Sequence, residues 1–279
     1  MNTTPTFLDL TRANRHALAA EAAAGLLRRP AQLAPKFFYN ALGSRLFDAI
    51  TQLSEYTATR AEAALLDQHR AALAAAVRAA LGPALTLVDI GAGNGQKAQR
   101  LFEALDVARY IAVDISIDYL REALSGLQAR HPAVRTVGVG MDFAAGLALP
   151  EALVSEPALL FYPGSSIGNF ESAQAAQLLA QMREQSAGGA LLIGVDLMKP
   201  AAQLQAAYDD ALGVTAAFNL NALRHVNEVL SADFDVRQWR HVASVDEAAG
   251  CVRMYLEARE ALTVCWPSGG ERRFERGER

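Results

Sequence analysis

The chain has 279 residues, of which 52% are hydrophobic and 20% are charged, and its formal net charge is −4. This composition excludes a disordered or low-complexity protein, because the apolar residues suffice to build a core. It also lacks the basic surplus that is typical of proteins that bind duplex nucleic acid. No apolar run approaches the ~18 residues of a membrane-spanning helix, and the N-terminal segment is not typical of a signal peptide. We therefore expect a cytoplasmic protein with neither a nucleic-acid nor a membrane partner.

The cysteines and histidines do not form a metal-binding pattern. Cys251 and Cys265 lie in apolar, strand-like stretches and are not spaced as C-x-x-C. The five histidines are scattered along the chain, so no zinc-binding histidine pair is present in the sequence. We expect no metal ion and two reduced thiols.

The first 81 residues are predicted to be mostly helical. Residues 9–28 are rich in Ala and Leu and should form a helix that ends before Pro30. Residues 31–60 are rich in aromatic side chains and contain part of an amphipathic helix, whose apolar positions recur every four residues at Phe38, Leu42, Leu46 and Ile50. Residues 61–81 should form another Ala-rich helix.

From residue 85 onward, short apolar runs alternate with segments of helix length, such as 116–130 and 171–186. The five runs are Leu85–Ile90, Tyr110–Ile115, Val134–Val139, Ala158–Tyr162 and Ala190–Asp196. This alternation predicts an α/β fold with a sheet of five parallel strands covered by helices on both faces. Residues 200–231 are predicted to be helical with a break at Gly213, and residues 239–266 to form antiparallel strands.

A glycine-rich turn, Gly91–Gly95, follows the first of these strands directly. Glycine lets the backbone turn sharply and approach a ligand closely. Asp89 lies at the end of the first strand and Asp114 at the end of the second, where a carboxylate can accept hydrogen bonds from ribose hydroxyls. The G-x-G-x-G spacing favours S-adenosylmethionine over a dinucleotide, whose usual motif is G-x-G-x-x-G. The alternative is a turn that serves only the packing of strand against helix.

Two further polar segments follow later strands. Asp142 and Phe143 come after the third strand, where a carboxylate can accept from an adenine amino group and an apolar ring can pack on the base. The segment FYPGSSIGNF, residues 161–170, follows the fourth strand, and Asn169 carries both donors and an acceptor for an amino acid. The alternative for Asn169 is a helix cap.

Four long motifs resemble one enzyme family. They are PKFFYNALGSRLFDAITQLSEYTATRAE (35–62), GAGNGQK (91–97), YPGSSIGNF (162–170) and the segment 194–227 that begins GVDLMKP. Together they resemble the histidine Nα-methyltransferases of ergothioneine biosynthesis over residues 10 to 279. The resemblance implies an enzyme that uses S-adenosylmethionine to trimethylate the α-amine of L-histidine to hercynine. It also implies a Rossmann-like methyltransferase domain, 61–197, and a second substrate domain built from residues 10–60 and 198–279.

The resemblance also implies roles for individual residues. The cofactor would be bound by Gly91, Gly93, Lys97, Asp114, Asp142 and Phe143, with Lys97 at its carboxylate. The amino acid would be bound by Tyr56, Gly164, Asn169, Tyr208, Phe218 and Met254, of which Phe218 and Met254 would line the imidazole pocket. Tyr39 would lie beside the amine, and Tyr39 and Asn169 are the candidate catalytic residues.

The resembling enzymes continue past the position of Arg279 with a segment that carries a Glu and a Ser for the imidazole, and their sheets have seven strands where five are expected here. The sequence leaves three alternative functions open. In the first, the acceptor is another amino acid or an aromatic amine. In the second, the chain binds S-adenosylmethionine without turnover, and in the third it is a nicotinamide-dependent dehydrogenase, which the glycine spacing disfavours.

Overall fold

The computed structural model describes residues 4–11, 15–268 and 270–279. The chain forms two compact units, each made from two segments. The first unit comprises Met1–Thr11 and Ala58–Asp196, and the second comprises Arg12–Thr57 and Leu197–Arg279. The domains expected from the sequence divide after residues 60 and 197 and assign residues 10 and 11 to the substrate domain, whereas these two residues belong to the first unit.

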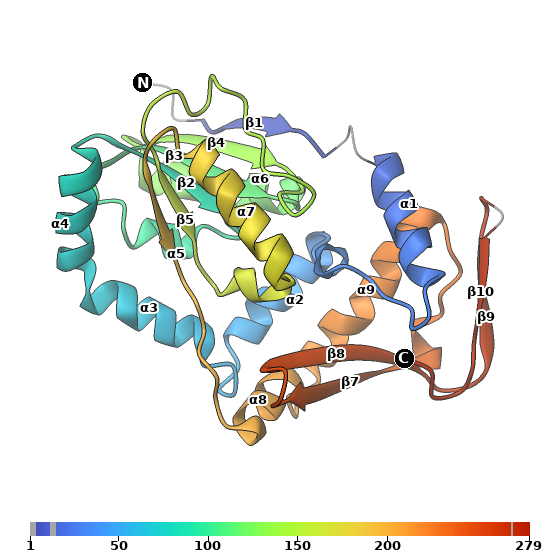
Figure 1. The fold of residues 1–279 in the computed structure, drawn as a ribbon. Coiled ribbons are helices and arrows are strands. Elements are labelled where there is room, and N and C mark those ends of the chain that lie inside the picture. Colours follow the sequence, from blue (N-terminus) through green and yellow to red (C-terminus); the bar gives the residue numbers. More distant parts are fainter. Residues whose placement is uncertain (1–3, 12–14, 269) are drawn as a thin grey trace. The chain divides into compact units, whose positions relative to one another are not determined.

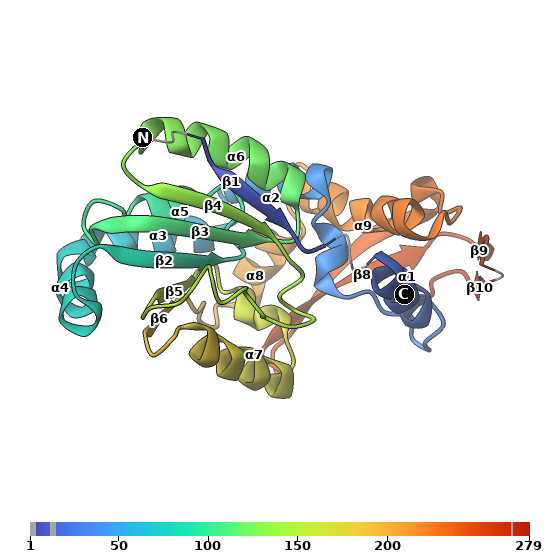
Figure 2. The same cartoon turned by 90° about the horizontal axis from the view of Figure 1, so that it is seen from above.

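The first unit is built on a sheet of six parallel strands in the order β1-β4-β3-β2-β5-β6 (Figures 1 and 2). The strands are β1 (Thr6–Asp9), β2 (Leu85–Ile90), β3 (Val107–Asp114), β4 (Arg135–Gly140), β5 (Leu159–Tyr162) and β6 (Ala190–Ile193). The strand order reverses between β2 and β5, as in Rossmann-like folds, so the predicted α/β class is confirmed. Ligands of such folds bind beyond the carboxyl ends of the strands near this reversal.

Helices cover both faces of this sheet (Figure 2). They are α3 (Ala58–Gln68), α4 (Arg70–Leu81), α5 (Gln96–Gln99), α6 (Ile117–Arg130), η3 (Ser166–Asn169) and α7 (Ser172–Gln185). Successive strand residues point to opposite faces. Leu87 and Tyr110 therefore pack with α3, α4 and α6, while Val88 and Ile111 pack with α7 on the other face.

The prediction of five parallel strands is wrong, because β1 adds a sixth. Thr6 to Asp9 pair in parallel with Val137 to Gly140 of β4. A Cβ on Gly138 would overlap with the ring of Phe7, so the glycine leaves the space that this ring fills. The helix predicted over 9–28 therefore begins later, and α1 spans Arg15–Leu26. Residues 12–14 of that prediction lie outside the described residues.

The helix predicted over 61–81 is two helices, α3 and α4. His69 separates them with φ −103° and ψ 11°, which is outside the helical range. The apolar runs predicted for strands lie on β2 to β6 with small shifts of their ends, as is usual for boundaries drawn from sequence.

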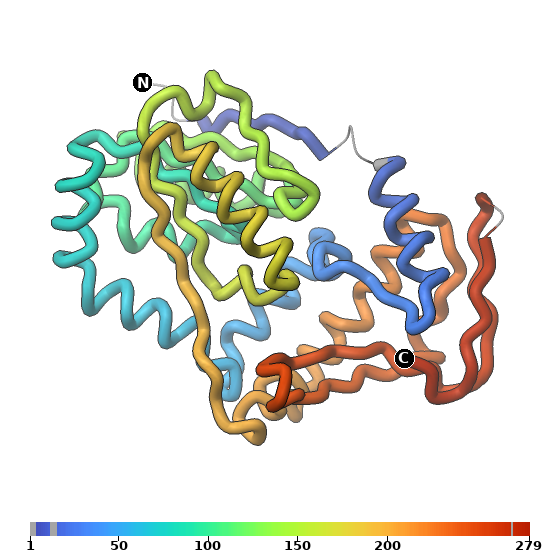
Figure 3. The backbone as a smooth tube through the Cα atoms, viewed as in Figure 1, coloured from blue at the N-terminus to red at the C-terminus, as the bar shows by residue number. Residues whose placement is uncertain are grey.

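The second unit combines helices with two antiparallel hairpins (Figure 3). Its helices are α1, η2 (Pro35–Phe38), α2 (Ala41–Thr51), α8 (Ala201–Tyr208), α9 (Val214–Leu230) and η4 (Val236–Gln238). Its strands are β7 (Trp239–Asp246), β8 (Cys251–Ala258), β9 (Leu262–Trp266) and β10 (Gly270–Phe274). Helix α9 packs against α1, α2 and β7, so the N-terminal segment and the C-terminal segment of this unit share one core.

Two predictions for the second unit are confirmed. The helical region 200–231 breaks before Gly213, whose φ is +74°, and the Asp210 carboxylate accepts from the amides of Val214 and Thr215 at 3.0 and 2.8 Å. This contact satisfies two of the free amides at the start of α9. Residues 239–266 are antiparallel, since β7 pairs with β8 and β9 with β10. Within the described chain, no helix combines the length and apolar character needed to cross a membrane.

Candidate active site

The turn between β2 and α5 has the backbone conformation that its glycines allow. Gly91, Gly93 and Gly95 have φ values of +72°, +55° and +69°, which side-chain-bearing residues rarely adopt. The amides of Gly91 and Ala92 donate to the carbonyl of Val113 at 2.8 and 3.0 Å, which fastens the turn to β3. A Cβ on Gly93 would meet no heavy atom of the described residues within 4 Å. The turn therefore presents bare backbone next to open space.

Asp114 lies at the end of β3, against this turn. Its Oδ2 accepts from the amide of Gly93 and its Oδ1 from the amide of Ser116, both at 2.9 Å. Burial raises the pKa of Asp114, and the two amide donors act in the opposite direction. The structure thus brings Asp114 and the glycine turn together, with each oxygen of the carboxylate keeping capacity for a further donor.

Phe143 also lies beside the turn. A Cβ on Gly91 would be 3.7 Å from the ring of Phe143, and that ring meets Tyr162 of β5 edge to face with centroids 6.1 Å apart. Asp142 accepts from the amides two and three residues later at 3.2 and 3.3 Å, so it also shapes its own loop. The structure brings Phe143 to Gly91.

Lys97, in α5, is paired with a residue that the sequence analysis missed. Its Nζ lies 2.6 Å from Oε2 of Glu62 in α3, and Oε1 of Glu62 accepts from the amide of Gly164 at 2.7 Å. Gly164 has φ +80° and follows β5. One carboxylate therefore joins a predicted cofactor residue to a predicted substrate residue.

Asp89 is a buried acid at the end of β2, with 1% of its surface exposed. Its Oδ2 accepts from the Tyr110 hydroxyl at 2.7 Å, while its Oδ1 accepts no hydrogen bond from the described residues. Burial raises the pKa of Asp89 from 3.8 to about 7, although the Tyr110 hydroxyl and the Lys97 ammonium lower it. The acid that ends the first predicted strand is thus held beneath the glycine turn.

Asn169 ends the short helix η3, which follows Gly164, and its side chain is exposed. Its side chain makes no hydrogen bond to the part of the chain that the structure describes. Ser165, in the left-handed region at φ +56°, accepts through Oγ from the amide of Asp196 at 2.9 Å. The loop is therefore fixed by Ser165 and Gly164, which leaves the Asn169 amide available to a ligand.

The remaining predicted residues gather in the second unit as one aromatic cluster. Phe218 of α9 is 4% exposed and meets Tyr39 edge to face at 5.5 Å between centroids. Tyr56 meets Tyr208 in the same way at 6.2 Å, and Met254 of β8 packs against the same cluster. The structure thus brings together four predicted substrate residues and the candidate catalytic residue Tyr39, which are up to 215 positions apart in the chain (39 to 254).

The backbone of Tyr208 is held by a buried polar group. The side-chain nitrogen Nδ2 of Asn219 lies 2.9 Å from the carbonyl of Tyr255 and 2.8 Å from Nδ1 of His241. Because the Asn219 nitrogen is a donor, Nδ1 of His241 accepts and Nε2 carries the proton. Nε2 lies 2.8 Å from the carbonyl of Tyr208 and therefore donates to it. Helix α8 is fixed to β7 at the residue that carries the predicted substrate contact.

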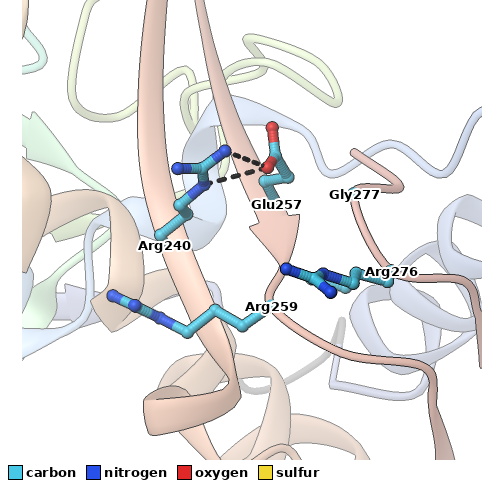
Figure 4. A pocket seen from close by; sticks show the side chains of 6 residues that line it. Arg240, Glu257, Arg259, Arg276 and Gly277 are labelled. Carbon is cyan, nitrogen blue, oxygen red and sulfur yellow. Dashed lines mark hydrogen bonds and ion pairs between the residues drawn. The ribbon is translucent and has the colours of Figure 1, made fainter.

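A cavity of about 240 Å³ lies elsewhere in the second unit (Figure 4). It is lined by Arg240, Glu257, Ala258, Arg259, Arg276 and Gly277, none of which is a predicted site residue. Glu257 is paired with Arg240 and with Arg279, so its charge is balanced within the unit. No group of His, Cys, Asp or Glu side chains that could hold a metal ion occurs among the described residues.

The model of one protein family matches residues 18–279, which is nearly the whole chain. The family is described as "Histidine-specific methyltransferase, SAM-dependent". The chain belongs to this family. The match includes the aromatic cluster, the glycine turn and the loop that carries Asn169, so the resemblance stated from the motifs is confirmed.

Curated relatives agree with this assignment. A histidine N-alpha-methyltransferase of Mycolicibacterium smegmatis is 40% identical over 254 residues, which are 89% of this chain and 77% of the relative. The enzyme of the same name from Mycobacterium tuberculosis is 38% identical over 87% of this chain and 75% of its own length. Ergothioneine biosynthesis protein 1 of Neurospora crassa is 32% identical, over 84% of this chain and 28% of that protein.

Sequence reasoning missed several residues that shape the surroundings of the glycine turn and the aromatic cluster. Phe47 meets Tyr39, Tyr56 and Phe218, with ring centroids about 6 Å apart in each pair. Its place in the aromatic-rich segment was a signal that could have found it. Glu62 and His241 gave no such signal, because their partners lie far away in the sequence.

Proposed function

We propose that this chain transfers methyl groups from S-adenosylmethionine to the α-amine of L-histidine until the trimethylated product, hercynine, is formed. The observation that carries the proposal is the match of the histidine-specific family over residues 18–279. The names of the mycobacterial relatives support histidine as the acceptor, and that of the fungal relative supports a place in ergothioneine biosynthesis. These names do not favour another amino acid or an aromatic amine as the acceptor, nor a protein that binds S-adenosylmethionine without turnover.

The residues around the glycine turn fit the cofactor. The bare backbone at Gly93 and Gly91 admits a ligand that a Cβ would exclude. Asp114 would accept from the ribose hydroxyls, Phe143 would pack on the adenine, and Asp142 would accept from its amino group. Lys97 would bind the cofactor carboxylate. When bound, S-adenosylmethionine supplies an electrophilic methyl group on a sulfonium.

The carboxylate of the amino acid would be bound by hydrogen-bond donors, for which Tyr56, Tyr208 and Asn169 are the proposed residues. Phe218 and Met254 line the imidazole pocket. This anchoring directs the amine nitrogen toward the methyl group, so that the reaction gains from orientation rather than from a strong base.

The amine must lose a proton before each transfer. Most of it is protonated near pH 7, since even the α-amino group of a protein has a pKa of roughly 8. The hydroxyl of Tyr39 would take the proton from the amine and pass it to water, while the Gly164 carbonyl would accept from the remaining N–H. Three transfers convert the ammonium into a trimethylammonium group and release three protons. The neutral Tyr39 hydroxyl and Gly164 carbonyl would hold the nitrogen weakly, which would let it rotate between transfers.

Mass spectrometry tests this proposal. The 279-residue chain is incubated with S-adenosylmethionine and an equimolar mixture of amino acids. We expect histidine alone to gain one, two and then three methyl groups. Methylation of a different amino acid would contradict the acceptor, and S-adenosylhomocysteine binding without any methylation would contradict the activity while leaving the cofactor site in place. We also propose that the enzyme works in the cytoplasm, together with its diffusible substrates.

A further inference from the structure

We infer that Glu62 is a positioning residue of the cofactor site. The inference rests on the proposed function, because it assigns to Glu62 the task of holding Lys97 and the Gly164 loop in place for S-adenosylmethionine. Glu62 lies in α3, outside every segment that the sequence analysis assigned to the cofactor. Its two carboxylate oxygens contact Lys97 at 2.6 Å and the Gly164 amide at 2.7 Å.

The carboxylate connects three separate parts of the first unit. Glu62 comes from α3, Lys97 from the helix that follows the glycine turn, and Gly164 from the loop after β5. The turn and the loop lie on the adjacent strands β2 and β5, at the strand-order reversal where this fold binds ligands. Glu62 therefore links the two loops that flank the predicted cofactor site.

Two glycines make room for this ion pair. A Cβ on Gly194, just after β6, would overlap with Oε1 of Glu62. A Cβ on Gly164 would lie 2.9 Å from Nζ of Lys97. Any side chain at Gly194 would displace the carboxylate, and one at Gly164 would press on the ammonium. The ion pair thus occupies space that exists because Gly164 and Gly194 have no side chains.

The pair is partly withdrawn from water, with side-chain exposures of 26% for Lys97 and 17% for Glu62. A lysine loses considerable rotamer entropy when it is fixed. Glu62 imposes that order before the cofactor arrives. An ammonium has three donors, so Lys97 can keep its contact with Glu62 and still donate to a cofactor carboxylate.

Calorimetric binding of S-adenosylhomocysteine tests the inference in the full chain. We expect Glu62→Gln to weaken binding about tenfold, because the neutral amide has one acceptor oxygen and cannot accept from both the Lys97 ammonium and the Gly164 amide. Lys97→Met should weaken binding as well, and the loss in the double variant should be smaller than the sum of the two single losses. Such non-additivity is expected if Glu62 acts through Lys97, while any further loss beyond Lys97→Met reports its contact with the Gly164 loop. Thermal unfolding of each ligand-free variant identifies a general loss of structure.

The matched control is Asp67→Asn. Asp67 also lies in α3 and pairs with Arg100, just after α5, at 2.7 Å, but both side chains are more than 40% exposed. This variant should bind S-adenosylhomocysteine as the wild type does. Unchanged or tighter binding by Glu62→Gln, or fully additive losses in the double variant, would overturn the inference. Failure of the wild type itself to bind would instead contradict the proposed function.

Discussion

The side-chain amide of Asn219 donates to Nδ1 of His241, with 2.8 Å between the two nitrogens. This contact fixes the tautomer of His241, so that Nε2 donates to the carbonyl of Tyr208, 2.8 Å away. Asn219 is only 2% exposed. A buried polar group of this kind connects α9, β7 and α8, and it ends at a residue proposed to bind the amino acid.

Replacement of His241 by Ala should therefore raise the KM for histidine about tenfold, because the end of α8 loses its anchor. The dissociation constant of S-adenosylhomocysteine should stay within twofold of the wild-type value. Steady-state kinetics and calorimetry measure the two constants. Asn227→Ala is the matched control, since Asn227 of α9 also bonds a backbone segment, at Phe234, but does not contact Tyr208. Equal effects of the two variants on KM would contradict a specific role for His241.

Asp89 should make the protein less stable as the pH rises. Its pKa is raised from 3.8 to about 7 in the folded chain, so folding retains a proton that the unfolded chain releases. The stabilisation is complete below about pH 4 and is lost as the pH approaches 7, with a total of about 4 kcal/mol. Urea unfolding of the wild type and of Asp89→Asn at pH 4.5 and 8 tests this. The wild type should lose about 3 kcal/mol more than the variant over this interval. A parallel pH dependence of the two proteins would show that Asp89 is not the titrating group.

Gly194→Ala should reproduce the effect of losing Glu62, because the new Cβ occupies the position of the carboxylate. We expect binding of S-adenosylhomocysteine to weaken by about tenfold. Gly126→Ala serves as the control. Gly126 lies inside α6, where a Cβ meets only the far end of the Arg130 side chain at 3.4 Å, and alanine should stabilise this helix by about 1 kcal/mol. Normal cofactor binding by Gly194→Ala would mean that the Glu62 carboxylate can shift without cost.

Asp114→Ala should abolish cofactor binding, since it removes the acceptor for ribose and also the contact to Gly93 that shapes the turn. Isothermal titration with S-adenosylhomocysteine should give a dissociation constant more than ~100-fold above the wild-type value. Retained binding would place the ribose elsewhere.

Tyr56→Phe should weaken the binding of histidine and leave the binding of the cofactor unchanged. Loss of the hydroxyl removes one donor to the histidine carboxylate, so the KM for histidine should rise about tenfold while cofactor affinity is unchanged. Tyr255→Phe, which changes a tyrosine of β8 outside the aromatic cluster, is the control. If Tyr56→Phe weakened the binding of both ligands equally, it would be wrong to assign the cofactor to the residues around the glycine turn and histidine to the aromatic cluster.

The sequence by itself determined the strands β2 to β6 and the glycine turn. Their signals are local: an apolar run of strand length, a glycine where φ must be positive, and an acid at a strand end such as Asp114. Long motifs then gave the family, because a motif such as residues 162–170 specifies many positions at once. None of these signals requires knowledge of a distant partner.

The tertiary structure decided the rest. β1 is too short to be recognised from its own residues, and it becomes a strand by pairing with β4, where Gly138 leaves space for Phe7. Glu62 is an ordinary helix residue until Lys97 and Gly164 meet it, 35 and 102 positions later. His241 likewise gains its role only from Asn219 and Tyr208. The identity of a single residue does not indicate its distant partners, since long-range contacts are formed by packing and not by local preference.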